Sequence, residues 1–224
     1  MNTTFKAIFL FDVDNTLIDN DRMKTDLGEY VRETFGAEAE KEFWTLYDEQ
    51  RVKHDYADFI GTLERFRCAH IQDMRTVRLS NWVLNYPFEE RLYPDAVAAV
   101  HHVSQWGLPV ILTDGDGVFQ PHKLESAGLI DAFGGNVLNY VHKEKELDNV
   151  LRAYPAEHYV LIDDKLKLLD AFKRALGDRV TTVFPCQGHY AEQQSTLENM
   201  LPADIEINRI AELMEHDFSE RVPA

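Results

Sequence analysis

Short apolar runs separated by helical segments constrain the fold of this chain more than any other feature. The first run, Lys6–Phe11, is apolar at every position after the lysine, which suits a parallel strand buried on both faces. Comparable runs follow at Pro109–Leu112, Tyr159–Ile162 and Val180–Phe184, and Asn136–Val141 is a shorter candidate. We therefore expect an α/β fold, a Rossmann-like parallel sheet with helices on both of its faces.

Helical spacing lies between these candidate strands. We expect helices over Pro94–Trp106, from about Lys143 to Tyr154 and over Leu166–Leu176, and a further helix that ends at Gly128. The tail, Ile205–Met214, is expected to close the fold as a helix with a weak strand before it.

A long helical stretch follows the first strand. From about Met23 to Tyr86, apolar residues recur at three- and four-residue steps, and no strand pattern intervenes. Packing between helices is the expected role of most aromatic side chains in this stretch. We expect a core domain formed by residues 1–16 and 93–224, and an inserted all-helical domain formed by residues 17–92.

The charge balance excludes several classes of partner. Lysine and arginine number 23 and aspartate and glutamate 39, which gives a formal net charge of −16. Such a surface repels nucleic acids and anionic membranes, and the sequence has no run of basic residues to offset this. We therefore expect no nucleic-acid partner and no membrane partner. A phosphorylated substrate would need a site that supplies its own positive field.

The expected location is the cytoplasm. No apolar stretch approaches the roughly 20 residues of a membrane span, and the N-terminal apolar run is too short and breaks into acids too soon for a signal peptide. The two cysteines, Cys68 and Cys186, are not close in sequence, and we expect both to be free and mostly packed thiols in a reducing compartment. The sequence carries no signal for an oligomeric state.

Acidic and polar residues follow three of the expected strands. In an open α/β sheet, ligands bind beyond the carboxyl ends of the strands, so three such ends suggest one shared site, whereas a single one would be ordinary turn chemistry. Two carboxylates about 4 Å apart repel by roughly 4 kcal/mol at an effective dielectric near 20, so the cluster needs a cation or raised pKa values. Hard oxygen ligands favour Mg²⁺ over zinc or copper. The residues are Asp12, Asp14, Thr113, Asp114, Asp163 and Asp164.

The order of these motifs resembles that of the haloacid dehalogenase superfamily. The first motif is Asp12–Thr16 (DVDNT), the second is Thr113, the third is Lys143, and the fourth is the pair Asp163 and Asp164. The resemblance covers the whole chain, and the helical insertion sits where class I cap domains of that superfamily sit. It implies a Mg²⁺-dependent phosphatase that acts on small phosphorylated metabolites.

The resemblance implies a role for each residue of the first motif. Asp12 is expected to be the nucleophile that forms an aspartyl-phosphate, which water later hydrolyses. Asp14 is expected to donate a proton to the leaving alkoxide and then to take one from the attacking water. Thr16 is expected to fix the turn by hydrogen bonding.

Two further motifs would bind and neutralise the phosphoryl group. Thr113 is expected to donate its hydroxyl to a phosphoryl oxygen. Lys143 is expected to neutralise both Asp12 and the phosphoryl group in the transition state, with Lys145 as a rival for that role because spacing does not separate the two.

The expected metal ligands are Asp12, the main-chain carbonyl of Asp14, and Asp164, with Asp163 bound directly or through water. Many relatives have Gly-Asp where this chain has Asp163 and Asp164, so the division of labour between these two acids stays open.

Substrate contacts are expected from the loop after the second motif and from the insertion. Asp114, Gln120 and Lys123 are the candidates near the second motif. Four basic residues of the insertion could equally be solvated helix-face charges: Arg22, Lys24, Arg51 and Lys53.

Three alternatives to a phosphatase remain. A phosphomutase or phosphotransferase of the same superfamily is compatible with Asp14. A haloacid dehalogenase attacks carbon and needs no second carboxylate in the first motif, so Asp14 argues against it. A non-catalytic phosphometabolite-binding module is disfavoured because the first motif is intact.

Overall fold

In the part of the chain that the structure describes, the sheet has six parallel strands in the order β3-β2-β1-β4-β5-β6. The computed structural model describes residues 4–189 and 200–222 of the chain. The α/β fold with a Rossmann-like parallel sheet is therefore confirmed. The strands are β1 (Phe5–Phe11), β2 (Leu108–Asp114), β3 (Val137–Tyr140), β4 (Ala156–Ile162), β5 (Val180–Pro185) and β6 (Ile205–Ile207).

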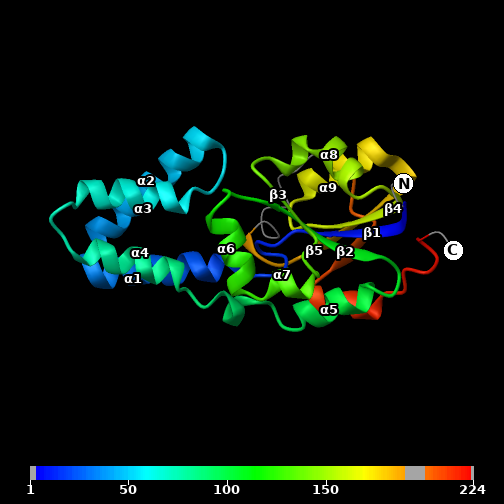
Figure 1. Cartoon of the computed structure of the whole chain (residues 1–224), viewed down its shortest axis with the longest axis horizontal. Helices are drawn as coiled ribbons and strands as arrows, with labels where there is room; N and C mark the ends of the chain where they lie inside the picture. Colours follow the sequence, from blue (N-terminus) through cyan, green and yellow to red (C-terminus); the bar gives the residue numbers. More distant parts are fainter. Residues whose placement is uncertain (1–3, 190–199, 223–224) are drawn as a thin grey trace.

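Helices cover both faces of this sheet (Figure 1). Helices α8 (Leu147–Ala153) and α9 (Leu166–Leu176) lie on one face, and α5 (Ala96–Val103) and α7 (Leu129–Ala132) lie on the other. The 3₁₀ helix η5 (Ile210–Glu215) packs beside α5. Two short 3₁₀ turns, η2 (Lys143–Lys145) and η3 (Gly177–Arg179), and helix α6 (Phe119–Ser126) complete this part of the chain.

Strand β1 is buried on both faces, as its apolar run predicted. Phe9 and Phe11 belong to one hydrophobic cluster, whereas Ile8 and Leu10 belong to a second cluster across the sheet. Alternate side chains of a strand point to opposite faces, so a strand between two helical layers must be apolar throughout.

The helical insertion lies between β1 and β2, beyond the end of the sheet to which β1 runs (Figure 1). Its aromatic residues pack between helices, as expected, and the rings of Phe43 and Phe66 meet edge to face at 5.5 Å. Its elements are α1 (Asn20–Phe35), α2 (Ala37–His54), α3 (Phe59–Ala69), α4 (Arg75–Leu84) and the 3₁₀ helix η1 (Phe88–Arg91).

The two connections between the insertion and the sheet run side by side. Asp19 N donates to Arg91 O at 2.8 Å, and Tyr93 N donates to Leu17 O at 2.9 Å. Ile18 also forms an antiparallel bridge with Leu92. The two segments that connect the insertion to the sheet are therefore paired with each other by hydrogen bonds.

Several expected elements differ from the structure. Strand β2 continues to Asp114, beyond the expected Leu112, because Thr113 and Asp114 pair with β3. The helix expected from Lys143 begins only at Leu147, after the turn η2. The tail has no α-helix over 205–214, since strand β6 there is followed by the 3₁₀ helix η5.

The exposure of a cysteine and the character of the helices can be compared with the expectations from composition. Cys68 is exposed, not packed as expected, because it lies on the solvent side of α3. Within the described residues, no helix combines the length and the apolarity that a membrane crossing needs.

Candidate active site

The turn after β1 is held by main-chain hydrogen bonds. Leu17 N and Ile18 N both donate to Val13 O, at 2.8 and 2.9 Å. Thr16 is fully buried, but its Oγ1 has no hydrogen-bond partner in the described part of the chain. The expectation that the Thr16 hydroxyl fixes this turn was therefore wrong, because converging amides on Val13 O do so instead.

Three carboxylates meet where β1 and β4 end. Carboxylate oxygens of Asp12, Asp163 and Asp164 lie within 4.8 Å of one another, and all three residues are buried. Strands β1 and β4 are neighbours and pair Phe11 with Ile162, so the residues that follow them emerge at the same edge. Register therefore brings together acids that are far apart in sequence.

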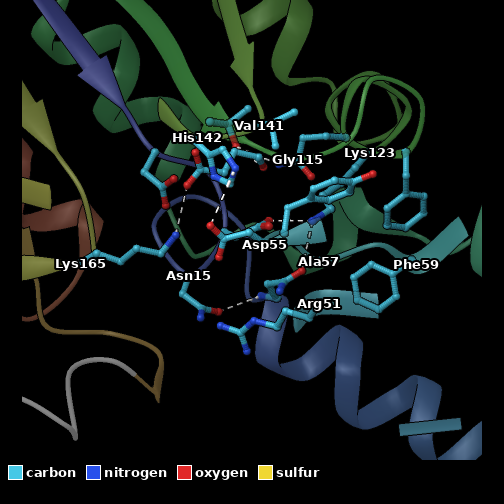
Figure 2. Close-up of a pocket in the computed structure, with 18 of the residues that line it drawn as sticks. Asn15, Arg51, Asp55, Ala57, Phe59, Gly115, Lys123, Val141, His142 and Lys165 are labelled. Carbon is cyan, nitrogen blue, oxygen red and sulfur yellow. Dashed lines mark hydrogen bonds and ion pairs between the residues drawn. The ribbon is translucent and has the colours of Figure 1, made fainter. Parts of the chain in front are cut away.

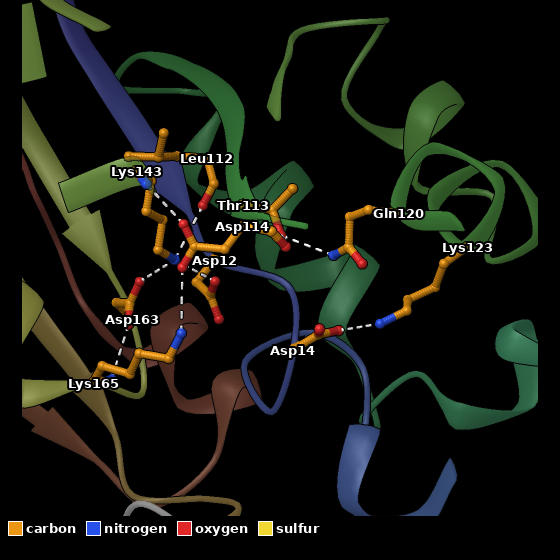
Figure 3. Close-up of polar contacts among 10 residues, drawn as sticks. All are labelled: Asp12, Asp14, Leu112, Thr113, Asp114, Gln120, Lys123, Lys143, Asp163 and Lys165. Carbon is orange, nitrogen blue, oxygen red and sulfur yellow. Dashed lines mark hydrogen bonds and ion pairs between the residues drawn. The ribbon is translucent and has the colours of Figure 1, made fainter. Parts of the chain in front are cut away.

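Lys143 lies inside this acidic cluster (Figure 3). Its Nζ donates to Asp12 Oδ1 and, at 2.6 Å, to Asp163 Oδ2. Burial disfavours the ammonium ion, but Asp12 and Asp163 outweigh burial and raise the pKa of Lys143 well above its ordinary value. Lys145 is exposed, so the structure places Lys143, and not its rival, beside the candidate nucleophile.

Asp114 holds the turn that carries Lys143. Asp114 Oδ1 accepts a hydrogen bond from Lys143 N at 2.8 Å, and Oδ2 lies 3.4 Å from Nζ of Lys165. Asp114 was expected to contact substrate, and it lines the cavity described below. Its carboxylate also positions these two lysines.

Unpartnered oxygens within the acidic cluster point to a cation site. Asp12 Oδ2 and both carboxylate oxygens of Asp164 are buried and lack a hydrogen-bond partner among the described residues. Burial, together with neighbouring carboxylates, raises the pKa of Asp12 to about 6 and that of Asp164 to about 9. Such a cluster fits a hard divalent cation, which would offset the repulsion and use the unpartnered oxygens as ligands.

The two adjacent acids of the fourth motif differ in their partners. Both oxygens of Asp163 are occupied, Oδ2 by Lys143 and Oδ1 by Lys165 N at 2.9 Å. Neither oxygen of Asp164 has a hydrogen-bond partner within residues 4–189 and 200–222. This difference favours Asp164 over Asp163 as the direct ligand.

Gln120 orients the hydroxyl of Thr113. Gln120 Nε2 donates to Thr113 Oγ1 at 2.9 Å, and both residues are buried. The amide occupies an acceptor site of the hydroxyl oxygen, and the hydroxyl donates to Asp114 O across 3.4 Å, a long contact that a phosphoryl oxygen could replace.

Asp14 lies apart from the three clustered acids. Its Oδ1 accepts a hydrogen bond at 2.7 Å from Nζ of Lys123, which also donates to Asn20 Oδ1 at 3.1 Å (Figure 3). The side chain of Lys123 is 1% exposed and that of Asp14 is 33% exposed. Lys123 was expected to contact substrate, whereas no role was expected for Asn20, whose place on α1 only the fold reveals.

Sequence reasoning also missed Lys165. Two carboxylates, Asp12 and Asp163, help to raise the pKa of Lys165 against the effects of burial and of Lys143. Figure 3 shows its side chain reaching from the end of β4 toward Asp114, with which it interacts at 3.4 Å. The available signal was its position directly after Asp163 and Asp164.

A cavity of about 400 Å³ joins these groups to the insertion (Figure 2). Lys24 and Arg51 line it, whereas Arg22 and Lys53 are not among its lining residues. His189 also lines it and lies 2.7 Å from an Asp21 carboxylate oxygen through Nδ1, although no role was expected for it.

Comparison with known proteins identifies relatives of the whole chain. A haloacid dehalogenase-like hydrolase from Burkholderia xenovorans LB400 is 45% identical, with a TM-score of 0.89 over 97% of this chain and 99% of that one. The HAD-hydrolase YfnB from Bacillus subtilis, bound to magnesium, is 16% identical with a TM-score of 0.62 over 95% and 98% of the two chains. L-2-haloacid dehalogenase from Xanthobacter autotrophicus is 15% identical with a TM-score of 0.57 over 95% and 98%. The last two share the fold.

A search of curated proteins found no match. The profile of the haloacid dehalogenase-like hydrolases matches residues 6–177, which include all the motif residues described above. This chain therefore belongs to the family of haloacid dehalogenase-like hydrolases.

Proposed function

We propose that this hydrolase is a Mg²⁺-dependent phosphatase that cleaves small phosphate monoesters through an aspartyl-phosphate on Asp12. One observation carries the proposal: a buried Asp12 carboxylate shares Lys143 with Asp163, while its second oxygen and those of Asp164 have no described hydrogen-bond partner. That arrangement combines a nucleophile, a fixed positive charge and open oxygen ligands at one point.

Asp12 and Asp164 would hold the metal, with the main-chain carbonyl of Asp14 as a further ligand and Asp163 beside them. Bound Mg²⁺ would supply positive charge to the phosphoryl oxygens and lessen the repulsion between phosphate and carboxylates. A phosphatase with this cluster of acids would need Mg²⁺, because the carboxylates would otherwise repel the phosphate.

The remaining chemistry belongs to side chains of this protein. An Asp12 oxygen attacks phosphorus as the bond from phosphorus to the ester oxygen breaks, and Asp14 gives its proton to the leaving alkoxide. Asp14 then takes a proton from water, which attacks the aspartyl-phosphate and releases inorganic phosphate. Lys143 and the hydroxyl of Thr113 stabilise the charge on the phosphoryl oxygens.

The inserted helices would serve as a cap. Residues 17–92 contribute side chains of α1 and α2 to the cavity, whose far end lies at the acidic cluster. Such a cap would exclude water and select small phosphorylated metabolites. The net charge of −16 supports the further proposal that neither nucleic acid nor a membrane is a partner. The two free cysteines support the proposal that the protein works in the reducing cytoplasm.

The pairing of Asp14 with Lys123 favours phosphoryl chemistry over dehalogenation. Attack on carbon followed by halide loss needs no proton for the leaving group, whereas an alkoxide does. A second carboxylate held in the cavity by a buried lysine therefore fits a phosphate ester.

Release of inorganic phosphate from p-nitrophenyl phosphate tests the proposal. We expect turnover that requires Mg²⁺ and that Asp12→Asn lowers by at least about 10³-fold, since the nucleophile is lost. Asp148→Asn is the matched control, because Asp148 is an exposed acid on α8. Circular dichroism should show the same fold in both variants.

Three results would contradict the proposal. Unchanged turnover in Asp12→Asn would remove this residue from the reaction. Halide release from 2-chloropropionate without metal would indicate a dehalogenase. Transfer of the phosphoryl group to a sugar hydroxyl, in preference to water, would indicate a phosphomutase or phosphotransferase.

A further inference from the structure

The cavity contains a second group of positive charges besides Lys143 in the acidic cluster. Lys24 on α1 and Arg51 on α2 line it from the insertion, and Lys123 lines it from α6. Figure 2 shows Arg51 and Lys123 around the same cavity. A chain with a net charge of −16 thus gathers basic side chains at this one surface.

Lys24 differs from its neighbours in having no acidic partner. It is half-buried and, within the described part of the chain, makes no hydrogen bond or ion pair. Its Nζ lies 5.8 Å from the centre of the Tyr47 ring. By contrast, Arg22 lies 2.7 Å from Asp26, and Lys123 lies 2.7 Å from Asp14.

Charges of both signs act on Lys24. Burial is the largest effect and lowers the pKa of Lys24. Asp14 and Asp21 act against burial, and the smaller effects of Arg51 and Lys123 lower the pKa again. A half-buried ammonium ion beside other cations is stabilised by an anion that enters from solvent.

The position of Lys24 on α1 separates it from the acidic cluster. Asn20 begins α1 and accepts a hydrogen bond from Lys123, which in turn reaches Asp14. Lys24 is four residues later on the same helix face, about 6 Å further along the axis. An anion at Lys24 would therefore be a different group from a phosphate at Asp12.

Two of the acids that line the cavity face a histidine. Asp55 and Glu144 also line the cavity, but both face His142, at 3.8 and 3.9 Å. Asp55 is the C-cap of α2 and Glu144 lies in η2, so His142 stands between the two acids. Lys24, which has no ion pair among the described residues, is the cation of the cavity that an anion from solvent would neutralise.

We propose that the natural substrate carries a second anionic group, a carboxylate or another phosphate, which Lys24 and Arg51 bind while the reacting phosphate lies at Asp12. This inference rests on the proposed phosphatase function. A cavity of about 400 Å³ suits a small metabolite with one anionic group at each end.

Comparison of three kinds of substrate tests the inference in the intact Mg²⁺-loaded protein. p-Nitrophenyl phosphate has no second anion, 2-phosphoglycolate and 3-phosphoglycerate have a carboxylate, and fructose 1,6-bisphosphate has a second phosphate. We expect the wild-type kcat/KM to be higher for at least one substrate with a second anion than for p-nitrophenyl phosphate. The carboxylate and bisphosphate arms distinguish the two chemical sources.

Removing the charge of Lys24 or Arg51 tests whether these residues bind the second anionic group. Lys24→Met and Arg51→Met should lower kcat/KM for the preferred substrate about 10- to 100-fold more than kcat/KM for p-nitrophenyl phosphate, mainly through KM. Lys24→Arg should restore most of the loss. Lys53→Met is the matched control, because Lys53 is an exposed base two residues from Arg51 and outside the cavity, and it should change neither value.

Outcomes separate this inference from the proposed function. If no substrate releases phosphate, the phosphatase proposal fails. If p-nitrophenyl phosphate is hydrolysed but no substrate with a second anion is preferred, or if Lys24→Met lowers kcat/KM equally for all substrates, the phosphatase stands and the inference of a second anionic group is overturned.

Discussion

Lys123 and Asp14 form an ion pair across 109 residues of sequence, with Nζ 2.7 Å from Oδ1. The lysine comes from α6, after β2, and the aspartate from the turn after β1. Because β1 and β2 are neighbours in the sheet, the pair holds the proposed acid–base carboxylate at the wall of the cavity.

Substitution of Lys123 should impair catalysis more than stability. Lys123→Met leaves Asp14 without its cation and Asn20 without a donor, so we expect kcat for p-nitrophenyl phosphate to fall about 10- to 100-fold. The free energy of unfolding should fall by about 1–2 kcal/mol, less than for a fully buried pair, because Asp14 is 33% exposed. Urea unfolding measures the second quantity, and an unchanged kcat would refute the positioning role of Lys123.

The two lysines of turn η2 should behave differently. Lys143→Met removes the only lysine of the third motif that contacts Asp12, so we expect kcat to fall by about 10³-fold or more. Lys145→Met replaces an exposed lysine two residues away and should leave kcat within about twofold of wild type. Steady-state kinetics on p-nitrophenyl phosphate measures both, and a large loss in Lys145→Met alone would reverse the assignment.

Magnesium affinity should rise with pH. In the metal-free protein, burial and the charges of Asp12 and Asp163 raise the pKa of Asp164 to about 9, so Mg²⁺ must displace a proton at neutral pH. We expect the apparent Kd to fall up to about tenfold per pH unit between pH 7 and pH 9. Isothermal titration calorimetry in two buffers of different ionisation enthalpy measures the released proton.

The same shift has a consequence for stability. The folded-state pKa of Asp164 is about 9, above the ordinary value of 3.8, so between these two pH values the chain takes up a proton when it folds. The metal-free protein should therefore lose stability as pH rises through about 9. Asp164→Asn should abolish the proton release and weaken Mg²⁺ binding more than Asp163→Asn does. Equal effects of the two substitutions would argue against Asp164 as the direct ligand.

Gly188 should not tolerate a side chain. Its φ is +76°, and an added Cβ would lie 2.5 Å from Cβ of Asn15. Asn15 itself has a φ of 62°, and its Oδ1 accepts from Asn20 N at 3.1 Å at the start of α1. We therefore expect Gly188→Ala to lower the free energy of unfolding by about 2–4 kcal/mol and to reduce kcat.

Gly135→Ala is the matched control for this substitution. Gly135 has a similar φ of +78°, but an added Cβ would meet no atom within 4 Å. It should cost only the backbone strain, about 1 kcal/mol. Equal losses of stability in urea unfolding of the two variants would show that contact with Asn15 is unimportant.

Local pattern determined the strands and the motif residues. The apolar runs predicted β1, β4 and β5 because a strand covered on both faces must be apolar on both. The order of the motifs predicted Asp12 and Lys143, because a nucleophile and a fixed positive charge require a carboxylate and an amine at these places. Where pairing with a neighbour decides the ends of an element, as in β2 and β6, the pattern alone failed.

The sequence by itself therefore determined that this chain forms a parallel α/β sheet with acids at the strand ends, since hydrophobic periodicity and local turn chemistry are properties of short segments. Only the tertiary structure decided the partners of those acids. Neighbouring β1 and β4 bring Asp164 to Asp12, and a lysine from α6 reaches Asp14. Such contacts depend on strand order and on side chains converging from distant segments, which no short stretch of sequence encodes.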